Sequence, residues 1–251
     1  MAATKKSSAA AKKKSAKGPT LVRPPRTYKP LAPERLNDLF QRLDATYPHA
    51  VCALNHRNAW ELLVATILSA QCTDARVNMV TPILFKIYPT SQAMAAVRPE
   101  ELEPVIQPTG FFRNKSKSLV GAAKRVVNDF GGKVPDTMEE LITIPGAARK
   151  TANVVLGSWF GKAEGVVVDT HVHRISRRLE LTKCDDAVNI EKDLMRVLPR
   201  DRWISFPHQI IHHGRQLCIA RNPKCAECPL ETLCHAEDKT WSTAEQHRGA
   251  R

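Results

Sequence analysis

Four cysteines near the carboxyl end of the chain constrain its architecture more than any other feature. They are Cys218, Cys225, Cys228 and Cys234, which lie within seventeen residues and are separated by six, two and five residues. Two ligands two residues apart can face one metal centre from a tight loop, and the outer two can close the site. Four thiolates suit a tetrahedral zinc ion and an iron-sulfur cluster equally well. The spacing therefore predicts a small loop that binds one of these two, structural zinc being the commoner.

The other three cysteines, at positions 52, 72 and 184, are scattered, and an odd total of seven argues against a disulfide framework. No run of 18 or more apolar residues occurs, and no apolar stretch precedes a small-residue cleavage site at the amino terminus. We therefore expect a cytoplasmic protein with no membrane partner, associated with the nucleoid if its source is bacterial. Nothing in the sequence indicates oligomerisation, so a monomer is expected.

The formal net charge of +13 is concentrated at the amino terminus, where nine Lys and Arg residues precede the first acidic residue, Glu34. This leaves about +4 for the rest of the chain. Lysine and arginine placed against phosphates release condensed counterions, so the charge suits a polyanionic partner, although a solubilising surface is an equal alternative. Residues 1–30 have almost no large apolar side chains, which predicts a disordered basic tail. Its lysines occur in blocks, which disfavours an organellar transit peptide.

From Pro33 onward the apolar residues repeat at helical spacing, and almost nothing alternates as a strand would. Residues 59–71 are apolar nearly all round, as in a helix at the centre of a bundle. Further helices are expected near 74–87, 115–130, 136–143, 149–160, 170–181, 189–198 and 202–217. The short apolar stretch 165–169 is expected to be an extended lead into a helix. The sequence thus predicts an all-α protein with short connections.

The segment 142–160, ITIPGAARKTANVVLGSWF, predicts two helices joined by a very short hairpin. Pro145 and Gly146 end the first helix, and Ala152, Val155 and Leu156 repeat at helical spacing in the second. The second helix would direct its free backbone N–H groups at solvent, which suits a DNA phosphate. An ordinary helical turn with surface charges is the alternative for this motif taken alone.

Four segments follow one another along the chain: LLVATILSAQCTDARVN at 62–78, TGFFRNKSKSL at 109–119, PGAARKTANVVL with VVVDTHVHRISRRL, and the four-cysteine run. Together and in this order they resemble the helix-hairpin-helix DNA glycosylases, and the endonuclease III family in particular. The resemblance covers about residues 33–236. It implies a two-lobed all-α fold, a 4Fe-4S cluster held by the four cysteines, and a DNA N-glycosylase with abasic-site lyase activity. The expected partner is double-stranded DNA containing damaged bases, chiefly oxidised pyrimidines, or abasic sites.

The resemblance also implies catalytic roles for Lys150 and Asp169. Lys150 matches the family's catalytic lysine, whose neutral amine attacks C1′ of the sugar, expels the damaged base and forms a Schiff base that leads to β-elimination. Arg149 and the positive end of the helix dipole would favour the neutral amine. Asp169 matches the catalytic aspartate, which stabilises developing positive charge or relays protons. Asp169 is also expected to cap the helix that starts at Thr170.

Further residues are assigned to DNA contacts by the same resemblance. Gln71 would fill the space left by the extruded nucleotide, and Phe111 would insert beside it as an apolar wedge. The hairpin residues expected to contact DNA are Gly146, Ala148, Arg149 and Thr151. Asp74 is expected to cap the following helix and to line the lesion pocket.

One residue departs from the family's hairpin pattern, because Ala148 occupies the place of the second glycine. If that position required a positive φ, alanine would cost roughly 1 kcal/mol or more and weaken DNA binding.

The resemblance implies four segments. These are a disordered tail at 1–30, a continuous helical domain at 55–164 that ends in the hairpin, a discontinuous cluster domain at 31–54 plus 165–236, and a flexible tail at 237–251. DNA would lie in the groove between the two lobes.

Two alternative functions follow from the same motifs. A mismatch adenine glycosylase of this superfamily, which is monofunctional, would lack the lysine at position 150 and carry an additional carboxyl-terminal domain. A non-catalytic iron-sulfur protein that only binds DNA would have no need of Lys150 and Asp169. The sequence favours the bifunctional enzyme over both.

Overall fold

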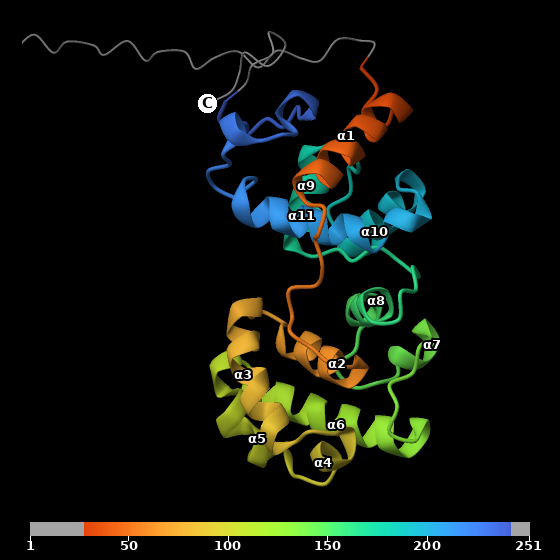
Figure 1. The fold of residues 1–251 in the computed structure, drawn as a ribbon, viewed down its shortest axis with the longest axis vertical. Helices are drawn as coiled ribbons and strands as arrows, with labels where there is room; N and C mark the ends of the chain where they lie inside the picture. The colour runs from red at the N-terminus through yellow and green to blue at the C-terminus, as the bar shows by residue number, and fades with distance from the viewer. Residues whose placement is uncertain (1–27, 242–251) are drawn as a thin grey trace, which may run out of the picture.

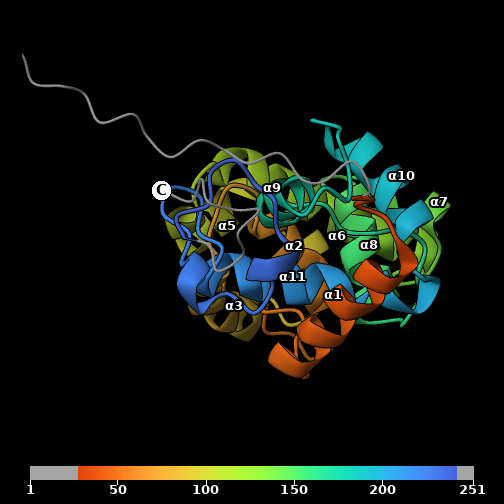
Figure 2. The same cartoon turned by 90° about the horizontal axis from the view of Figure 1, so that it is seen from above.

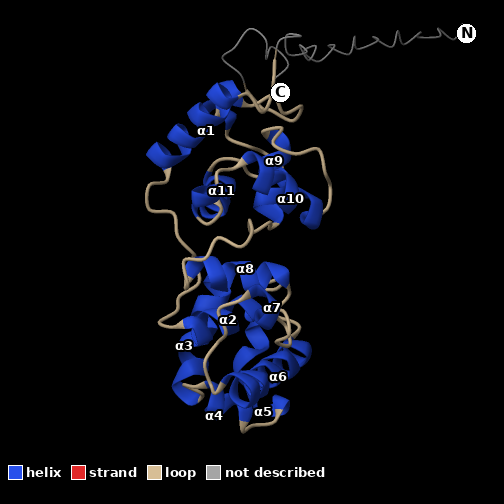
Figure 3. Cartoon of the chain, turned by 90° about the vertical axis from the view of Figure 1, so that its right-hand side faces the viewer, coloured by secondary structure: helices blue, strands red, loops and turns tan. Residues whose placement is uncertain are grey.

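The computed structural model describes residues 28–241, and within that range the chain is helical with no β-strand (Figure 3). The α-helices are α1 (Pro33–Thr46), α2 (Ala59–Leu68), α3 (Asp74–Ile87), α4 (Ser91–Ala95), α5 (Pro99–Ile106), α6 (Phe112–Phe130), α7 (Met138–Leu141), α8 (Arg149–Ser158), α9 (Thr170–Arg178), α10 (Ala187–Val197) and α11 (Ser205–Gln216). Short 3₁₀ turns are η1 (Gln107–Thr109), η2 (Arg200–Arg202), η3 (Cys225–Glu227) and η4 (Glu231–Leu233). The all-α prediction is confirmed.

Two separate hydrophobic cores divide the described chain into two lobes. One core is formed by buried side chains between Leu54 and Leu156, contributed by α2 to α8. The other combines residues of α1 with residues between Val166 and Leu230. Figure 1 shows α2–α7 at one end of the molecule, α1 and α9–α11 at the other, and α8 between them. The chain crosses between the lobes twice, after α1 and after α8.

Side-chain caps explain where several helices begin. Asn58 accepts a hydrogen bond from the backbone N–H of Glu61 at 2.9 Å and starts α2. Nine of the ten residues of α2 are buried, which agrees with its apolar sequence. Helices α4 and α5 were not expected from the sequence, because five and eight residues are too few for a clear helical period. Residues 166–169 lead into α9 without a strand, as expected.

The ends of the described chain pack against the lobe that contains α1 and α9–α11, here called the cluster lobe because it contains the four cysteines. The expected basic tail falls mostly on residues 1–27, which lie outside the described residues, but the Tyr28 hydroxyl donates to Glu180 at 2.6 Å. Residues 237–251 were expected to form a flexible tail, and 242–251 lie outside the described residues. Lys239, by contrast, is 4% exposed and forms an ion pair with Glu231 at 2.6 Å, so the folded part extends beyond residue 236. In Figure 2, seen from above, the dark-blue carboxyl-terminal segment lies near α9 and α11, and the red amino-terminal segment continues into α1.

No helix within residues 28–241 has both the length and the apolar character needed to cross a membrane.

Candidate active site

The predicted hairpin joins α7 to α8. Gly146 has a φ of +83°, and the Ala147 N–H donates to the Ile144 carbonyl at 2.9 Å to close the turn. Helix α8 begins at Arg149, and its N-cap residue, Ala148, has no side-chain cap. The first N–H groups of α8 therefore lack the side-chain acceptor that a Ser or Asp cap would supply.

Position 148 does not require a positive φ, so alanine is accommodated there without strain. Its φ is −73° and its ψ is 170°, which is an extended conformation open to any residue. The residue that needs the left-handed region is Gly146, two positions earlier. Alanine at position 148 therefore introduces no backbone strain into the hairpin.

We predict that Gly146→Ala destabilises the hairpin by about 1–3 kcal/mol, because alanine is strained at this φ. A Cβ at this position would also lie 3.0 Å from the Ser118 Cβ and 3.3 Å from the Ile67 Cγ2. Thermal unfolding measures the effect. The control is Gly161→Ala, because Gly161 has a φ of +67° but no atom within 4 Å of a Cβ. The melting temperature should fall further for Gly146→Ala; equal falls would show that the close packing is unimportant.

One cavity of about 600 Å³ brings together three of the residues singled out by the sequence, Lys150, Asp169 and Asp74. Lys150 is on the first turn of α8, and Asp169 is the N-cap of α9, so the two lobes each contribute one residue. The remaining lining residues are Val51, Cys52, Ala53, Leu54, Thr66, Ser69, Val154, Val167, His208, Ile211, His212 and Arg215.

Hydrogen bonds to its Oδ1 hold the Asp169 carboxylate in place. The backbone N–H groups of His171 and Val172 both donate to this oxygen at 2.8 Å. The expected capping role is therefore confirmed. No hydrogen bond or ion pair of the described chain uses Oδ2, and the side chain lines the cavity. The backbone thus fixes the orientation of a carboxylate that also borders the space next to Lys150.

The expectation that Asp74 caps α3 is wrong. Thr73 is the N-cap, and its hydroxyl accepts from the Arg76 N–H at 3.3 Å. Asp74 is instead the first helical residue, and its carboxylate accepts from Arg215 of α11 at 2.6 Å. The sequence around position 74 gave no sign of this partner, which is 141 residues away. The ion pair joins the two lobes at the wall of the cavity.

His208 is a cavity residue to which the sequence assigned no role. Burial lowers the pKa of His208 to about 4, with a smaller contribution in the same direction from His212. His208 is therefore neutral at pH 7. Its Nε2 lies 3.3 Å from the Ser158 hydroxyl. An uncharged imidazole lets this wall of the cavity accept a neutral ring without burying a charge.

A second ion pair joins the lobes close to Lys150. The Arg149 Nε donates to the carboxylate of Glu191 on α10 at 3.0 Å, and Asn153 donates to the same carboxylate at 2.9 Å. Glu191 is buried, and its hydrogen bond raises the pKa of Arg149. The sequence suggested Arg149 as a phosphate contact, yet one edge of its guanidinium is occupied within the protein. Its side chain remains 48% exposed.

Gln71 and Phe111 lie outside this cavity, in the turns that follow α2 and η1. Both are exposed, and both have a left-handed backbone, with φ values of 53° and 48°. Only one other non-glycine residue of the described chain shares that conformation. The Phe111 side chain is 62% exposed, so a large apolar group faces solvent at this turn. Thr151, on the first turn of α8, is half-buried.

The four cysteines line one small cavity in the cluster lobe. Burial raises the pKa of Cys228 to about 12 and that of Cys234 to about 11, so these thiols become thiolates at neutral pH only when a metal replaces the proton. Within residues 28–241 no three His, Cys, Asp or Glu side chains are grouped closely enough for a single metal ion. The four side chains that the resemblance assigned to the cluster thus share one cavity.

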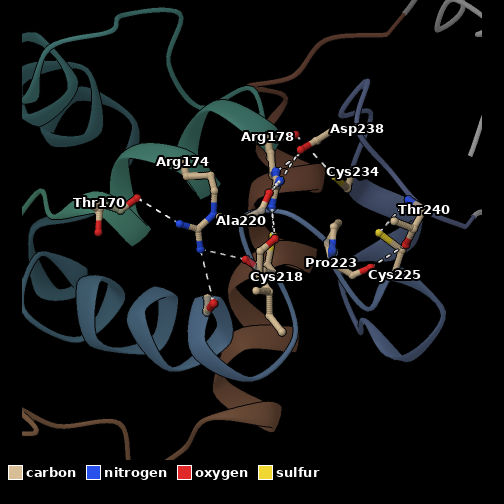
Figure 4. Close-up of polar contacts among 12 residues, drawn as sticks. Thr170, Arg174, Arg178, Cys218, Ala220, Pro223, Cys225, Cys234, Asp238 and Thr240 are labelled. Carbon is tan, nitrogen blue, oxygen red and sulfur yellow. Dashed lines mark hydrogen bonds and ion pairs between the residues drawn. The ribbon is translucent and has the colours of Figure 1, made fainter. Parts of the chain in front are cut away.

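Two arginines of α9 hold the cysteine loop against the rest of the lobe (Figure 4). Arg178 donates to the Cys218 sulfur at 3.2 Å and forms an ion pair with Asp238. Arg174 donates to the Cys218 carbonyl at 2.9 Å. On the other side, the Thr240 N–H donates to the Cys225 sulfur at 3.4 Å. Donors aimed at the sulfurs favour their ionised form.

Family models match both parts of this architecture. The model described as HhH-GPD superfamily base excision DNA repair protein matches residues 64–200, and the iron-sulfur binding domain of endonuclease III matches residues 218–234. The hairpin, the cavity and the cysteine loop thus define a helix-hairpin-helix DNA glycosylase of base excision repair.

Relatives and solved structures narrow this class. The chain is 53% identical to endonuclease III of Synechocystis over 201 residues, covering 80% of this chain and 92% of the relative. It is 46% identical to the Bacillus subtilis endonuclease III, covering 77% and 88%. A trapped covalent intermediate of endonuclease III with DNA superposes with a TM-score of 0.76 at 42% identity, covering 80% and 94% of the two chains.

The chain belongs to the endonuclease III family. It is a DNA glycosylase and abasic-site lyase, and it carries a 4Fe-4S cluster, as the resemblance of its motifs implied. The family match decides between zinc and an iron-sulfur cluster, which the cysteine spacing alone left open.

Proposed function

We propose that the chain excises oxidised pyrimidines from double-stranded DNA by way of a Schiff base on Lys150. The observation that carries this proposal is the shared cavity, which has Lys150 of one lobe and Asp169 of the other in its wall. The related endonuclease III has been trapped as a covalent intermediate with DNA. A lysine amine is the side chain of this cavity that can form a covalent bond with an aldehyde carbon and later release it.

The reaction would proceed through a covalent bond between Lys150 and the sugar. The neutral Lys150 amine attacks C1′, and the bond from C1′ to the base breaks with its electron pair leaving on the base, which takes up a proton. Loss of the amine proton and ring opening give a Schiff base between Nζ and C1′. Removal of a C2′ proton then expels the 3′ phosphate by β-elimination. Water finally hydrolyses the Schiff base and releases the enzyme.

Asp169 is proposed to act on the first of these steps. Expulsion of the base leaves positive charge on the sugar, and a fixed carboxylate beside it lowers the energy of that state. Its capping hydrogen bonds use one oxygen, Oδ1, and so orient the group without consuming both oxygens. Asp74 and the neutral His208 would border the extruded base.

DNA contacts are proposed for the hairpin and for two turns of the helical lobe. The free N–H groups at the start of α8, with Gly146, Ala148, Arg149 and Thr151, would bind backbone phosphates. Gln71 and Phe111 would enter the duplex where the damaged nucleotide leaves it.

The cluster is proposed to be ligated by Cys218, Cys225, Cys228 and Cys234. Bound there, it would supply a rigid crosslink for a loop that has few helical hydrogen bonds of its own. Arg174 and Arg178 would transmit that rigidity to α9, which begins at Asp169.

We further propose that the enzyme acts as a monomer in the cytoplasm, in keeping with the bacterial relatives. Its lobes would comprise residues 55–164 and residues 31–54 plus 165–236, each with its own core.

An assay with defined duplexes tests the proposed substrate class. We predict that a duplex with one thymine glycol loses its base and is cut at that site, whereas a duplex with an adenine mismatch is not. Base release is followed by chromatography and strand cleavage by gel electrophoresis. Release of adenine without strand cleavage would instead support the monofunctional alternative. Binding without either reaction would support the non-catalytic one.

A further inference from the structure

A buried lysine outside the catalytic cavity connects the two turns that carry Gln71 and Phe111. Lys115 is in the first turn of α6 and is 5% exposed. Its Nζ donates to the Leu68 carbonyl at 2.9 Å and to the Thr109 carbonyl at 2.7 Å. Leu68 is the last residue of α2, three positions before Gln71, and Thr109 is two positions before Phe111. The ammonium therefore binds the backbone just before both turns.

These two hydrogen bonds fix the separation of the turns. Because both oxygens lie within 3 Å of one nitrogen, they cannot be more than about 5.6 Å apart, the two bond lengths taken together. The Lys115 N–H also donates to the Phe111 carbonyl at 3.0 Å, so the lysine is bound to one of the turns through its backbone as well. A single residue thus connects the end of α2, the η1 turn and the start of α6.

The local charge explains how an ammonium is accommodated here. Neither acceptor is a carboxylate, so Lys115 does not belong to a buried ion pair. The Leu68 carbonyl is at the carboxyl end of α2, where the aligned peptide dipoles favour a cation. Burial nevertheless lowers the pKa of Lys115. An apolar side chain would avoid this desolvation cost, but it would leave the buried carbonyls of Leu68 and Thr109 without the donor that joins them.

We propose that Lys115 is a positioning residue for nucleotide extrusion: it locks the Gln71 and Phe111 turns at one spacing, so that both side chains enter the duplex together. This inference rests on the proposed function, in which these two side chains replace the extruded nucleotide. Each turn is held in a left-handed conformation at its exposed residue, and a loss of the common anchor would let the two move independently.

The test compares two substrates and two lysines. Lys115→Met keeps an unbranched, flexible side chain that is one atom shorter and removes the donors, and Lys117→Met makes the same change at an exposed position of α6. Strand cleavage is measured on an abasic duplex and on a single-stranded abasic oligonucleotide, which needs no extrusion. We expect Lys115→Met to lower the duplex-to-single-strand rate ratio about 10- to 100-fold, since small misplacements cost that much. Lys117→Met should leave the ratio unchanged.

The ratio is insensitive to partial unfolding, because the folded fraction affects both substrates equally. Lys115→Gln, with an amide donor on a shorter side chain, provides the same comparison should the methionine variant fail to fold. The fluorescence of 2-aminopurine placed opposite the abasic site provides a second measurement. Its intensity should increase when the wild-type protein binds, and it should increase much less when Lys115→Met binds.

Combining Lys115→Met with Phe111→Ala distinguishes a shared role from an independent one. If Lys115 acts through the turn of Phe111, the double variant should show nearly the ratio of Phe111→Ala alone. An unchanged ratio in the Lys115 variants, or fully additive losses, would overturn the proposal. Failure of the wild-type protein to cut either substrate would instead refute the proposed function.

Discussion

Replacing Lys150 with alanine is expected to reduce cleavage of an abasic duplex by roughly three orders of magnitude or more, because no other amine of the cavity can form the Schiff base. Lys150 is exposed on the first turn of α8, and alanine is a good helix former. The fold and most of the DNA affinity should therefore survive. Strand cleavage under single-turnover conditions gives the rate, and electrophoretic mobility gives the affinity.

Lys192→Ala is the matched control for this variant. Lys192 is an exposed lysine on α10 and does not line the cavity. It should cleave at the wild-type rate. A Lys150→Ala protein that cleaves as fast as the control would exclude the amine at position 150 as the nucleophile.

Replacing Asp169 with asparagine is expected to slow base excision about 10²- to 10⁴-fold while leaving the fold intact. An asparagine side chain has an oxygen that can accept from the N–H groups of His171 and Val172, so α9 keeps its cap. Only the negative charge is lost. Cleavage of a preformed abasic site should suffer less, because no base has to be expelled. Rates on a thymine glycol duplex and on an abasic duplex measure the difference.

Asp186→Asn provides the comparison for this prediction. Asp186 caps α10 by accepting from the Asn189 N–H at 2.9 Å, and it does not line the cavity. The same substitution at that cap should leave both rates unchanged. If Asp169→Asn were as active as Asp186→Asn on the lesion duplex, the charge of Asp169 would have no part in base loss.

The longer helices were predictable from the sequence because they are amphipathic or apolar over about nine residues or more. Leu36, Leu39, Phe40 and Leu43 repeat at helical spacing in α1, and α2 is an apolar run, so both helices are predicted without knowledge of what packs against them. Helices α4 and α5 were missed, since each is too short to show a period, and α5 contains an internal proline, Pro104. The hairpin was predictable because a glycine after a proline marks the turn.

Side-chain partners far apart in the sequence were not predictable. The carboxylate of Asp74 pairs with Arg215, and that of Glu191 with Arg149. Neither pairing leaves a local pattern, because each depends on how the two lobes meet. The doubt about Ala148 had a similar origin, since the φ of one residue cannot be obtained from its neighbours' identities. Lys115 could not be distinguished from the exposed Lys117 two residues later.

Reduction with borohydride during reaction with an abasic duplex tests the central claim most directly. A Schiff base between protein and sugar is reduced to a stable amine, so the protein becomes covalently joined to the DNA. Proteolysis and mass spectrometry of the adduct should locate the modification at Lys150. An enzyme that cleaves the duplex but forms no adduct, or an adduct at another lysine, would contradict this account.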